Sequence, residues 1–253
     1  MKRYDVITLF PEMFDAIADS GVTRRALDEK VWELQCWNPR EFASDKYKTI
    51  DDRPFGGGPG MVMKAAPLSA AIMAAKARQK EFTVTPKVIY LSPQAKPMKD
   101  ADVRRLSTEN GLILLCGRYE GIDERVVETL VDEEISIGDF VLSGGELAAM
   151  VLIDAMVRLL PGVLNDGSSA VEDSYSPMRN GFLDHPHYTR PETWEDITVP
   201  TPLMSGNHRE IAEWRRQQTI LRTWQRRPDL LNTALLSAKE LRWIGEKIKS
   251  IKK

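Results

Sequence analysis

Short apolar runs alternate with helical segments through the middle of this 253-residue chain, and this rhythm restricts the fold more than any other feature. Most positions in these runs are apolar, as in strands that are buried on both faces. Such strands separated by helices predict an α/β fold whose parallel sheet is covered on both sides. The runs are residues 88–91, 112–116 and 134–137, and the helical segments lie near 99–107, 123–130 and 145–160.

Composition divides the chain into three parts. The first, residues 1–160, contains this α/β pattern and begins with further strands expected at 4–9 and 31–37. Residues 161–204 are rich in Pro, Gly, Ser and Asp, which is typical of a flexible linker or loop. Residues 205–253 are expected to form a small all-helical domain.

The overall composition is that of a soluble globular protein, with 42% apolar and 28% charged residues. Two cysteines, Cys36 and Cys116, are too few for a disulfide framework or a four-cysteine zinc site. No apolar stretch approaches the roughly 18 residues that span a membrane, and the N-terminus lacks the apolar run of a signal peptide. We therefore expect a reduced, cytoplasmic protein without a membrane partner.

Charge is distributed unevenly along the chain. Residues 205–253 contain twelve Lys and Arg against five Asp and Glu, a net charge of +7, whereas residues 1–204 carry −9. Aromatic residues stand beside the arginines, as in Trp214-Arg215-Arg216, and arginine holds phosphates and stacks on bases. This pattern favours RNA as the partner, with Arg215 and Arg216 as contacts, although a solvated helical face with buried tryptophans is the alternative. The net charge of the whole chain, −2, gives no indication of a DNA-binding protein.

Three predicted strands run into unusual loops at their carboxyl ends. In open parallel sheets the ligand lies beyond these ends, and glycine lets the backbone approach a ligand closely. One such loop is an ordinary turn, but three at one edge favour a small-molecule pocket. The loops are residues 90–93, 117–121 and 138–145.

This pocket does not match the common nucleotide or hydrolase sites. No G-x-G-x-x-G follows a strand, which argues against a nicotinamide dehydrogenase. The cluster FGGGPGM (55–61) lacks the Gly-Lys-Ser/Thr ending of a phosphate loop, and no G-x-S-x-G nucleophile elbow occurs. The role of residues 55–61 stays open, with a rigid turn as the simplest interpretation.

Two closely spaced histidines are weak evidence for a metal site in this chain. Asp184-His185-Pro186-His187 resembles a metal-binding tract. The proline restricts convergence of the two histidines, and no further Cys or His lies close in the sequence. We therefore expect no metal site here, and a structural or RNA-contacting role for His187.

Five motifs occur in an order that is specific for one family. Together they resemble the bacterial tRNA (guanine-N1)-methyltransferases of the SPOUT superfamily, which methylate guanosine at tRNA position 37, next to the anticodon. The resemblance covers nearly the whole chain. It implies an α/β domain with a deep trefoil knot, a homodimer with a shared active site, and S-adenosylmethionine held bent inside the knot. The motifs are RPFGGGPGM (53–61), GRYEGID (117–123), SIGDFVLSGGE (136–146), PHYTRP (186–191) and SGNH (205–208).

The resemblance also implies roles for individual residues and a dependence on Mg²⁺ without an assigned site. Asp173 corresponds to the general base of the family and Arg158 to its electrophilic partner. The contacts with the target guanosine and neighbouring RNA would be Glu120, Asp184, His187 and Arg190. The S-adenosylmethionine pocket would be formed by Tyr90, Leu91, Gly117, Tyr119, Ser136, Ile137, Gly138, Asp139, Phe140, Val141, Leu142, Gly144 and Gly145.

These residue types suit the chemistry of guanine methylation. Guanine N1 carries a proton at neutral pH, so a base such as Asp173 is needed, and a fixed cation such as Arg158 can stabilise charge at O6. Without the resemblance, Asp173 would be a turn residue and Arg158 a cation near a helix C-terminus. Two other functions stay open. One is a related knotted methyltransferase with another RNA target, such as a ribose 2′-hydroxyl, and the other is a non-catalytic RNA-binding protein.

Overall fold

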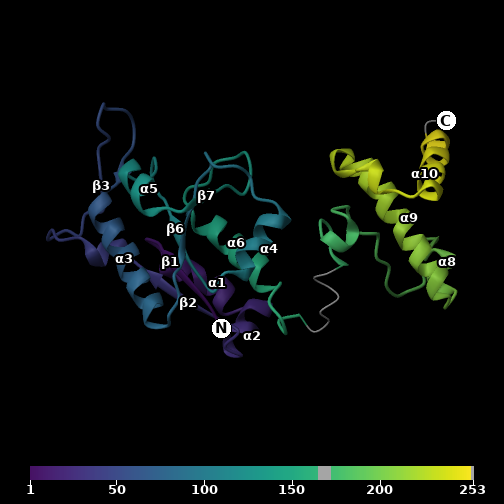
Figure 1. Cartoon of the computed structure of the whole chain (residues 1–253), viewed down its shortest axis with the longest axis horizontal. Helices are drawn as coiled ribbons and strands as arrows, with labels where there is room; N and C mark the ends of the chain where they lie inside the picture. The colour runs from purple at the N-terminus through teal and green to yellow at the C-terminus, as the bar shows by residue number, and fades with distance from the viewer. Residues whose placement is uncertain (165–171, 252–253) are drawn as a thin grey trace. The chain divides into compact units, whose positions relative to one another are not determined.

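A computed structural model describes residues 1–164 and 172–251, and the contacts within it divide the chain into two compact units (Figure 1). Unit 1 is Met1–Asn165 and unit 2 is Asp166–Lys253. Residues 165–171, which belong to the expected linker, lie outside the described part of the chain. Each unit has its own apolar core and is treated separately below.

A five-stranded parallel sheet forms the centre of unit 1, as the apolar runs predict. The strands are β1 (Lys2–Ile7), β2 (Trp32–Trp37), β5 (Lys87–Leu91), β6 (Gly111–Cys116) and β7 (Glu133–Ile135). Their order in the sheet is β2-β1-β6-β5-β7, so β7 pairs with β5 although it follows β6 in the chain. β6 lies between two strands and is buried at every residue, which explains its continuously apolar sequence.

Alternating side chains divide the core of unit 1 between the two faces of the sheet. Along β6, Leu112, Leu114 and Cys116 pack on one face, and Ile113 and Leu115 pack on the other. With both faces covered by helices, the ends of the strands are where a ligand can bind. The first face is covered by α4 (Asp100–Thr108) and α6 (Glu146–Val157), and the second by α3 (Ala65–Glu81) and α5 (Glu124–Leu130). The remaining helices of unit 1 are η1 (Pro11–Phe14), α1 (Asp15–Ala18), α2 (Gly21–Asp28) and η2 (Pro39–Phe42).

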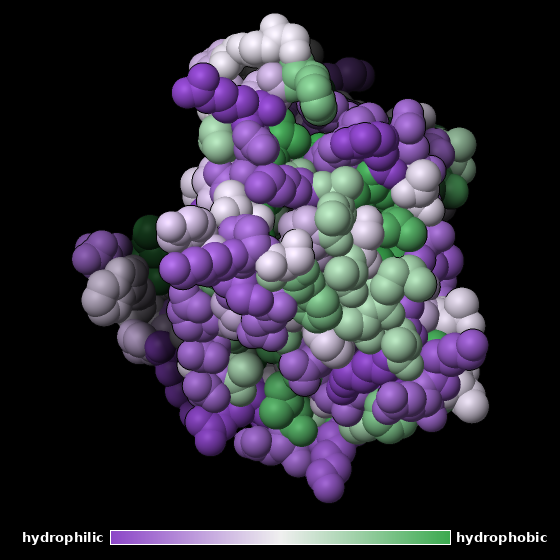
Figure 2. Space-filling model, turned by 90° about the vertical axis from the view of Figure 1, so that its left-hand side faces the viewer, coloured by the Kyte–Doolittle hydropathy of each residue, from purple (hydrophilic) through white to green (hydrophobic). Residues whose placement is uncertain are grey.

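A short antiparallel hairpin carries the glycine-rich segment of unit 1. Its strands are β3 (Asp51–Asp52) and β4 (Val62–Met63). Figure 1 shows the segment between them projecting beside α5, and Figure 2 shows the projection at the top of the face on which α3 lies. The segment therefore extends beyond the packed layers of the unit.

Unit 2 is built around α9 (His208–Arg226) and α10 (Ala238–Ile251), in agreement with the expected helical content. The linker expected at 161–204 needs correction, because Phe182 is fully buried in the core of unit 2, between side chains of the two helices such as Ile220 and Ile244. Burial of this aromatic ring stabilises a fixed structure for the segment, whereas its Pro and Gly content predicted a flexible linker. The other elements are η3 (Pro177–Arg179), β8 (Thr193–Trp194), β9 (Ile197–Thr198), α8 (Thr201–Met204), η4 (Pro228–Leu230) and η5 (Thr233–Leu235). Across the described residues of both units, no helix has the length and apolar character needed to cross a membrane.

Candidate functional site

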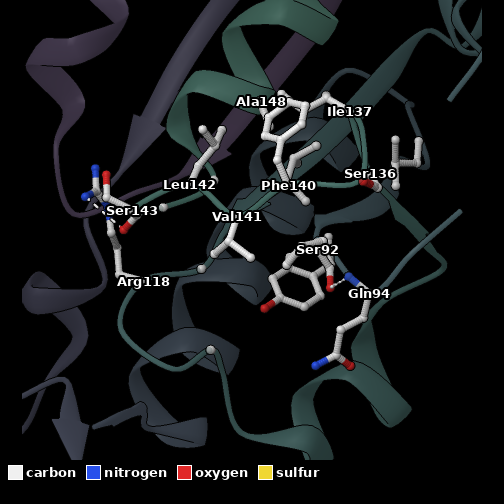
Figure 3. A pocket seen from close by; sticks show the side chains of 18 of the residues that line it. Ser92, Gln94, Arg118, Ser136, Ile137, Phe140, Val141, Leu142, Ser143 and Ala148 are labelled. Carbon is white, nitrogen blue, oxygen red and sulfur yellow. Dashed lines mark hydrogen bonds between the residues drawn. The ribbon is translucent and has the colours of Figure 1, made fainter. Parts of the chain in front are cut away.

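The loops that follow β5, β6 and β7 meet in a cavity of about 190 Å³ at the carboxyl edge of the sheet (Figure 3). Eleven of the thirteen residues expected to form a cofactor pocket line this cavity. The two exceptions, Gly138 and Asp139, belong to the loop after β7 but do not line the cavity. Further lining residues are Ser92, Pro93, Gln94, Arg118, Glu120, Gly121, Ile135, Ser143 and Ala148.

Backbone hydrogen bonds hold the three loops against one another. The amide of Gly145 donates to the carbonyl of Gly117 (3.0 Å), which joins the loop after β6 to the start of α6. The amide of Met98 donates to the carbonyl of Ser136 (2.9 Å), and the amide of Ser136 donates to the carbonyl of Lys96 (3.3 Å). These bonds join the loop after β5 to the loop after β7. The shape of the cavity is therefore set largely by the main chain.

Two glycines at the cavity leave no room for a side chain. A Cβ atom on Gly145 would lie 2.8 Å from the Cα atom of Cys116, which is held in β6. A Cβ atom on Gly117 would lie 2.9 Å from the hydroxyl oxygen of Tyr90. Burial, with a smaller effect from nearby carboxylates, raises the pKa of Tyr90 to about 12, so this phenol is neutral and fills its space as a hydrogen-bonding group. Glycine is required where the loops approach so closely.

The cavity combines apolar walls with a few polar groups. Figure 3 shows Phe140, Leu142 and Ala148 on one side and Ser92 and Gln94 on the other. The hydroxyl of Ser92 accepts a hydrogen bond from the amide of Gln94 (3.2 Å), which orders the loop after β5. Apolar walls that alternate with polar groups suit a small organic molecule that itself carries polar groups.

An ion pair, which sequence analysis missed, fixes one end of the cavity. Arg118 Nε lies 2.8 Å from Oε2 of Glu146, the first residue of α6, and this carboxylate is fully buried. Thr8, just after β1, donates to the other carboxylate oxygen (3.0 Å). Arg118 also donates to the carbonyl of Ser143 (3.2 Å) and lies 4.4 Å from the ring centre of Phe10. A buried carboxylate is tolerated because it is fully paired, and its signal in the sequence is a single acidic residue opening an apolar helix.

The residues expected to act on the target base lie in both units. Glu120 is exposed at the cavity, where its amide donates to the carbonyl of Met61 (3.0 Å). Arg158 is half-buried at the C-terminal end of α6 and does not line the cavity. Asp173 is half-buried in unit 2, where its carbonyl accepts from the amide of Ser176 (3.2 Å). The cavity and the expected general base thus belong to different units.

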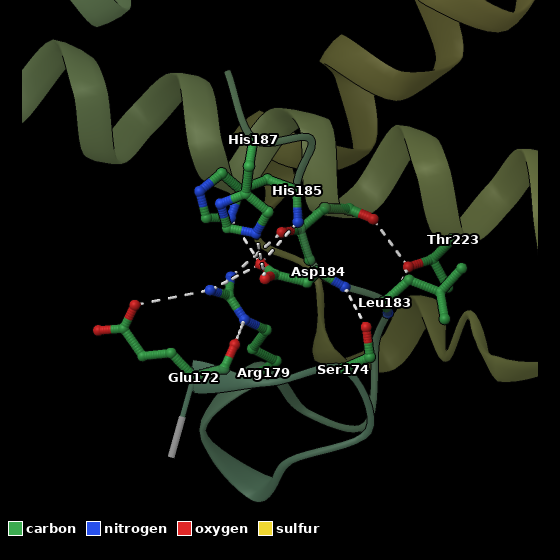
Figure 4. A network of polar contacts seen from close by, with 9 residues as sticks. Glu172, Ser174, Arg179, Leu183, Asp184, His185, His187 and Thr223 are labelled. Carbon is green, nitrogen blue, oxygen red and sulfur yellow. Dashed lines mark hydrogen bonds and ion pairs between the residues drawn. The ribbon is translucent and has the colours of Figure 1, made fainter. Parts of the chain in front are cut away.

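Asp184 is the centre of a polar network in unit 2 (Figure 4). Its Oδ1 forms an ion pair with Nη2 of Arg179 (2.8 Å) and accepts from Nδ1 of His185 (2.6 Å), and its Oδ2 accepts from Nε2 of His187 (2.9 Å). Burial opposes ionisation of Asp184, but hydrogen bonds from His187 and the His185 backbone, with the charges of His185 and Arg179, lower its pKa. An ionised carboxylate only accepts, so each histidine carries its proton on the nitrogen that faces Asp184.

The two histidines converge more closely than the proline between them led us to expect. Their ring centres lie 4.6 Å apart, because both rings turn toward the Asp184 carboxylate. Asp184, His185 and His187 offer ligand atoms within 4.8 Å of one another, a spacing that a metal ion would accept. The guanidinium of Arg179 already supplies positive charge to the same carboxylate, which favours a hydrogen-bonded network. That no metal binds here stays a prediction.

The other predicted RNA contacts differ in how free their side chains are. Arg190 and Arg215 are exposed. Arg216 is half-buried, with Nε 2.7 Å from Oε1 of Glu240 and its guanidinium 5.3 Å from the ring centre of Phe182. Arg216 therefore has a structural role in unit 2 that its sequence position did not reveal, whereas Arg215 is accessible to a phosphate.

Comparisons with known proteins bear directly on this arrangement. A family model described as tRNA (Guanine-1)-methyltransferase TrmD matches residues 1–233. Proteins named tRNA (guanine-N(1)-)-methyltransferase are similar to this chain in Dechloromonas aromatica (60% identity; 97% of this chain and 96% of the relative), Chromobacterium violaceum (59%; 96% and 95%) and Stutzerimonas stutzeri (56%; 98% and 96%). These matches confirm the family and the class of enzyme expected from the five motifs. The chain belongs to the tRNA (guanine-1)-methyltransferase family.

Proposed function

We propose that this chain transfers the methyl group of S-adenosylmethionine to N1 of guanosine 37 in tRNA, next to the anticodon. The observation that carries the proposal is the cavity built by three strand-end loops in a member of this family. The test is incubation with labelled S-adenosylmethionine and unmodified tRNA, followed by mapping of the methylated nucleoside. Label on a ribose or at another position would contradict the proposal, and tRNA binding without any transfer would indicate a binding protein.

The residues around the cavity fit S-adenosylmethionine. Gly117 and Gly145 bring bare backbone to the cavity, and the apolar side chains of Leu91 and Leu142 suit a flat purine ring. Glu120 adds a negative charge, which suits a sulfonium cation. When bound, the cofactor supplies an activated methyl group, so the task of the protein is to bind, orient and exclude water.

The deep trefoil knot is part of the same proposal. The chain leaves β6, passes β5 and adds β7 on the far side of β5. Around the cavity, Arg118 pairs with Gly144, and Pro97 pairs with Ser136. These pairings between distant segments support a chain that is threaded through its own loop, a topology that is otherwise very rare.

Asp173 and Arg158 are assigned the chemical roles. Formation of the N1–CH₃ bond would break the bond between the methyl carbon and the sulfonium sulfur, which would keep the electron pair as a thioether, and the carboxylate of Asp173 would accept the N1 proton. Negative charge shifts toward O6 of the base during this step, and the guanidinium of Arg158 stabilises it. Both residues also have interactions within the folded chain.

Unit 2 is assigned to tRNA. Its exposed Arg190 and Arg215 suit phosphates, and the basic helical segment has a net charge of +7. Asp184 and His187 are assigned to the RNA around the target guanosine, where His187, exposed and already oriented by Asp184, can contact a base. With tRNA as the partner, the proposed location is the cytoplasm.

A homodimer with a shared active site is also proposed, with one face of α6 in the interface. Leu147 and Val151 stand one turn apart on α6 and are 47% and 49% exposed. Phe10, which packs on Arg118 beside the start of α6, is 38% exposed. Apolar side chains gathered beside a site are expected where a second copy packs. Sedimentation should show a dimer that Val151→Lys dissociates, and a monomeric parent protein would contradict the assignment.

The dependence on Mg²⁺ implied by the family stays a prediction. Removal of divalent ions with a chelator should slow methyl transfer and leave S-adenosylmethionine affinity unchanged. Full activity after chelation would contradict it. We assign no ligands for this ion.

A further inference from the structure

A second cavity, of about 250 Å³, is lined by side chains of α9 and α10 in unit 2. It shares no residue with the cavity of unit 1. It is smaller than the roughly 300–1,000 Å³ typical of pockets for drug-sized ligands, so it suits one ring system rather than a whole cofactor. Among the residues that line it are Glu213, Arg216, Gln217, Lys239, Glu240 and Trp243.

Four of the charged side chains at this cavity are paired with one another. Nε of Arg216 lies 2.7 Å from Oε1 of Glu240, and Nζ of Lys239 lies 2.6 Å from Oε1 of Glu213. Both pairs join α9 to α10. Because these charges satisfy one another, and because the wall of the cavity is mostly apolar, the interior favours an uncharged ligand.

Trp243 and Gln217 are available for contact with such a ligand. The indole of Trp243 packs against the core of unit 2, is half-buried and lines the cavity. The side-chain amide of Gln217 forms no hydrogen bond within the described residues, so both its donor and its acceptor are available. An aromatic ring beside an amide suits an unpaired nucleobase, because the ring stacks on the face of the base and the amide reads its edge.

The charge around the cavity favours a base that belongs to a nucleic acid. Residues 205–253 carry a net charge of +7. Arg209, one turn before Glu213 on α9, is exposed and has no ion pair in the part of the chain that the structure describes, and the same holds for Arg242, next to Trp243 on α10. Such cations beside an uncharged slot suit the phosphates attached to a bound base. A neutral small molecule would leave both arginines unused.

We propose that this cavity holds one unpaired base of the bound tRNA, stacked on Trp243 and hydrogen-bonded at its edge to Gln217. This inference rests on the proposed function, because it takes tRNA as the substrate. The base is a different one from the methylated guanosine, since Asp173, assigned to that guanosine, does not line this cavity. Gln217 and Trp243 have no part in the chemistry. Loss of their contacts should weaken tRNA binding and leave S-adenosylmethionine affinity intact.

The test compares Gln217→Leu with Gln218→Leu in the full-length protein. Gln217→Leu keeps the approximate size of the side chain but removes both hydrogen bonds, so tRNA affinity should fall about 5- to 150-fold, the usual contribution of a bidentate contact with a base. Gln218→Leu is the matched control, because Gln218 is also half-buried on α9 but does not line the cavity. It should bind tRNA as the parent does. Binding is measured with unmodified tRNA in the absence of S-adenosylmethionine, so the affinities do not depend on methyl transfer.

A direct readout uses ¹⁹F NMR of protein labelled with 5-fluorotryptophan. The signal of Trp243, assigned by its loss in Trp243→Phe, should shift when tRNA is added to the parent, and it should shift less in Gln217→Leu. In methyl transfer, Gln217→Leu should raise the KM for tRNA and leave the single-turnover rate at saturating tRNA unchanged.

Two results would overturn the proposal: equal tRNA affinity in the parent and Gln217→Leu, or a Trp243 signal that tRNA does not move. An equally large shift with adenosine 5′-monophosphate alone, at the same concentration, would also overturn it and make the cavity a site for free nucleotides. If the parent binds tRNA but does not methylate guanine N1, the proposed function fails, and the binding comparison still decides the role of this cavity. The two failures are therefore distinguishable.

Discussion

The two units build their sites from different materials. In unit 1 the cavity is shaped by main-chain hydrogen bonds and by glycines such as Gly117 and Gly145, which have no space for a side chain. In unit 2 the polar site is made of charged side chains around one carboxylate, Asp184. A backbone-built site selects its ligand by shape and depends little on salt, whereas a site of charged side chains, of which His187 is exposed, responds to salt and pH. This difference supports the proposal that unit 1 recognises the cofactor and unit 2 recognises the RNA.

The apolar cores of the two units differ in size. Unit 1 has two large apolar clusters, one on each face of the sheet. Among the described residues of unit 2, the core contains four buried apolar side chains, those of Phe182, Ile220, Leu236 and Ile244. A small core supplies little hydrophobic free energy, so side-chain pairs such as Arg216–Glu240 carry a larger share of the stability of unit 2.

Asp173→Asn should have the largest effect, because it should slow methyl transfer without changing cofactor affinity. The substitution keeps the shape of the side chain but removes its ability to accept the proton of guanine N1. Single-turnover methyl transfer should fall roughly 10²- to 10⁴-fold, the usual contribution of a general base. S-adenosylmethionine affinity should not change, because the cavity belongs to unit 1.

Glu172→Gln is the control for this prediction. Glu172 is an exposed neighbouring carboxylate whose contact with Arg179 is long, 3.6 Å, so its neutralisation should have little effect. Parent-like transfer by Asp173→Asn would return Asp173 to the role of a turn residue.

Arg158→Ala should also slow the chemical step, through lost stabilisation of charge at O6.

The backbone character of the cavity can be broken by one methyl group. Gly145→Ala places a Cβ atom 2.8 Å from the backbone of Cys116, which cannot yield as a flexible side chain can. S-adenosylmethionine affinity should fall about 10- to 100-fold, the equivalent of overpacking a rigid site. Gly245→Ala in α10 is the matched control, since a Cβ atom there meets nothing within 4 Å. Equal affinities in calorimetry would show that the cavity is not the cofactor site.

The charge-based character of unit 2 predicts a difference between adjacent arginines. Arg215→Ala should flatten the dependence of log affinity for tRNA on log salt by about one unit, because one phosphate contact is lost. Arg216→Ala should chiefly lower the melting temperature of unit 2, since it removes the partner of Glu240 and the contact with Phe182. An unchanged slope for Arg215→Ala would assign that arginine to a solvated surface.

The smallest expected effect is a loss of stability of unit 2 at acidic pH. Burial lowers the pKa of His185 below its ordinary value of 6.5, so the unfolded chain binds a proton more readily than the folded one. The free energy of unfolding of unit 2 should therefore decrease as the pH falls below about 6.5. The pKa of Asp184 is also lowered in the folded chain, so its carboxylate stabilises unit 2 until the pH is much more acidic, where protonation removes this contribution.

Thermal unfolding followed by tryptophan fluorescence can measure this effect, because the ring of Trp214 lies 6.5 Å from that of His185. His185→Gln should flatten the pH dependence near neutrality. His208→Gln should leave it unchanged, since His208 is exposed. An identical pH profile in the parent and His185→Gln would exclude His185 as its source.

Local sequence patterns predicted the sheet and the cavity well. The buried run of β6 is continuously apolar because it faces helices on both sides, and periodicity detects that directly. The cavity could be predicted because parallel strands end at the same edge, so that loops such as 117–121 and 138–145 have to converge there. The general base and the RNA contacts at Glu120, Asp184, His187 and Arg190 depended on family resemblance, and they stay predictions.

Local sequence patterns could not predict contacts between residues that are distant in the chain. The pair of Arg118 and Glu146 joins segments that only the fold brings together. The burial of Phe182 depends on helices that begin more than twenty residues later, so its segment was expected to be a linker. His185 and His187 were expected to stay apart, but one carboxylate with two oxygens draws both rings toward it.

The place of β1 in the sheet limits when the site can form during translation. β1 leaves the ribosome before β6 and α6, yet Arg3 pairs with Gly111 on β6, and the hydroxyl of Thr8 donates to Glu146. A nascent chain shorter than this has an open strand edge on β1 and no acceptor for Thr8, and such edges attract other chains. A ribosome that stalls before residue 146 therefore releases a fragment that lacks the acceptor of Thr8 and the partner of Arg118. Only chains that extend past the start of α6 can complete the cavity.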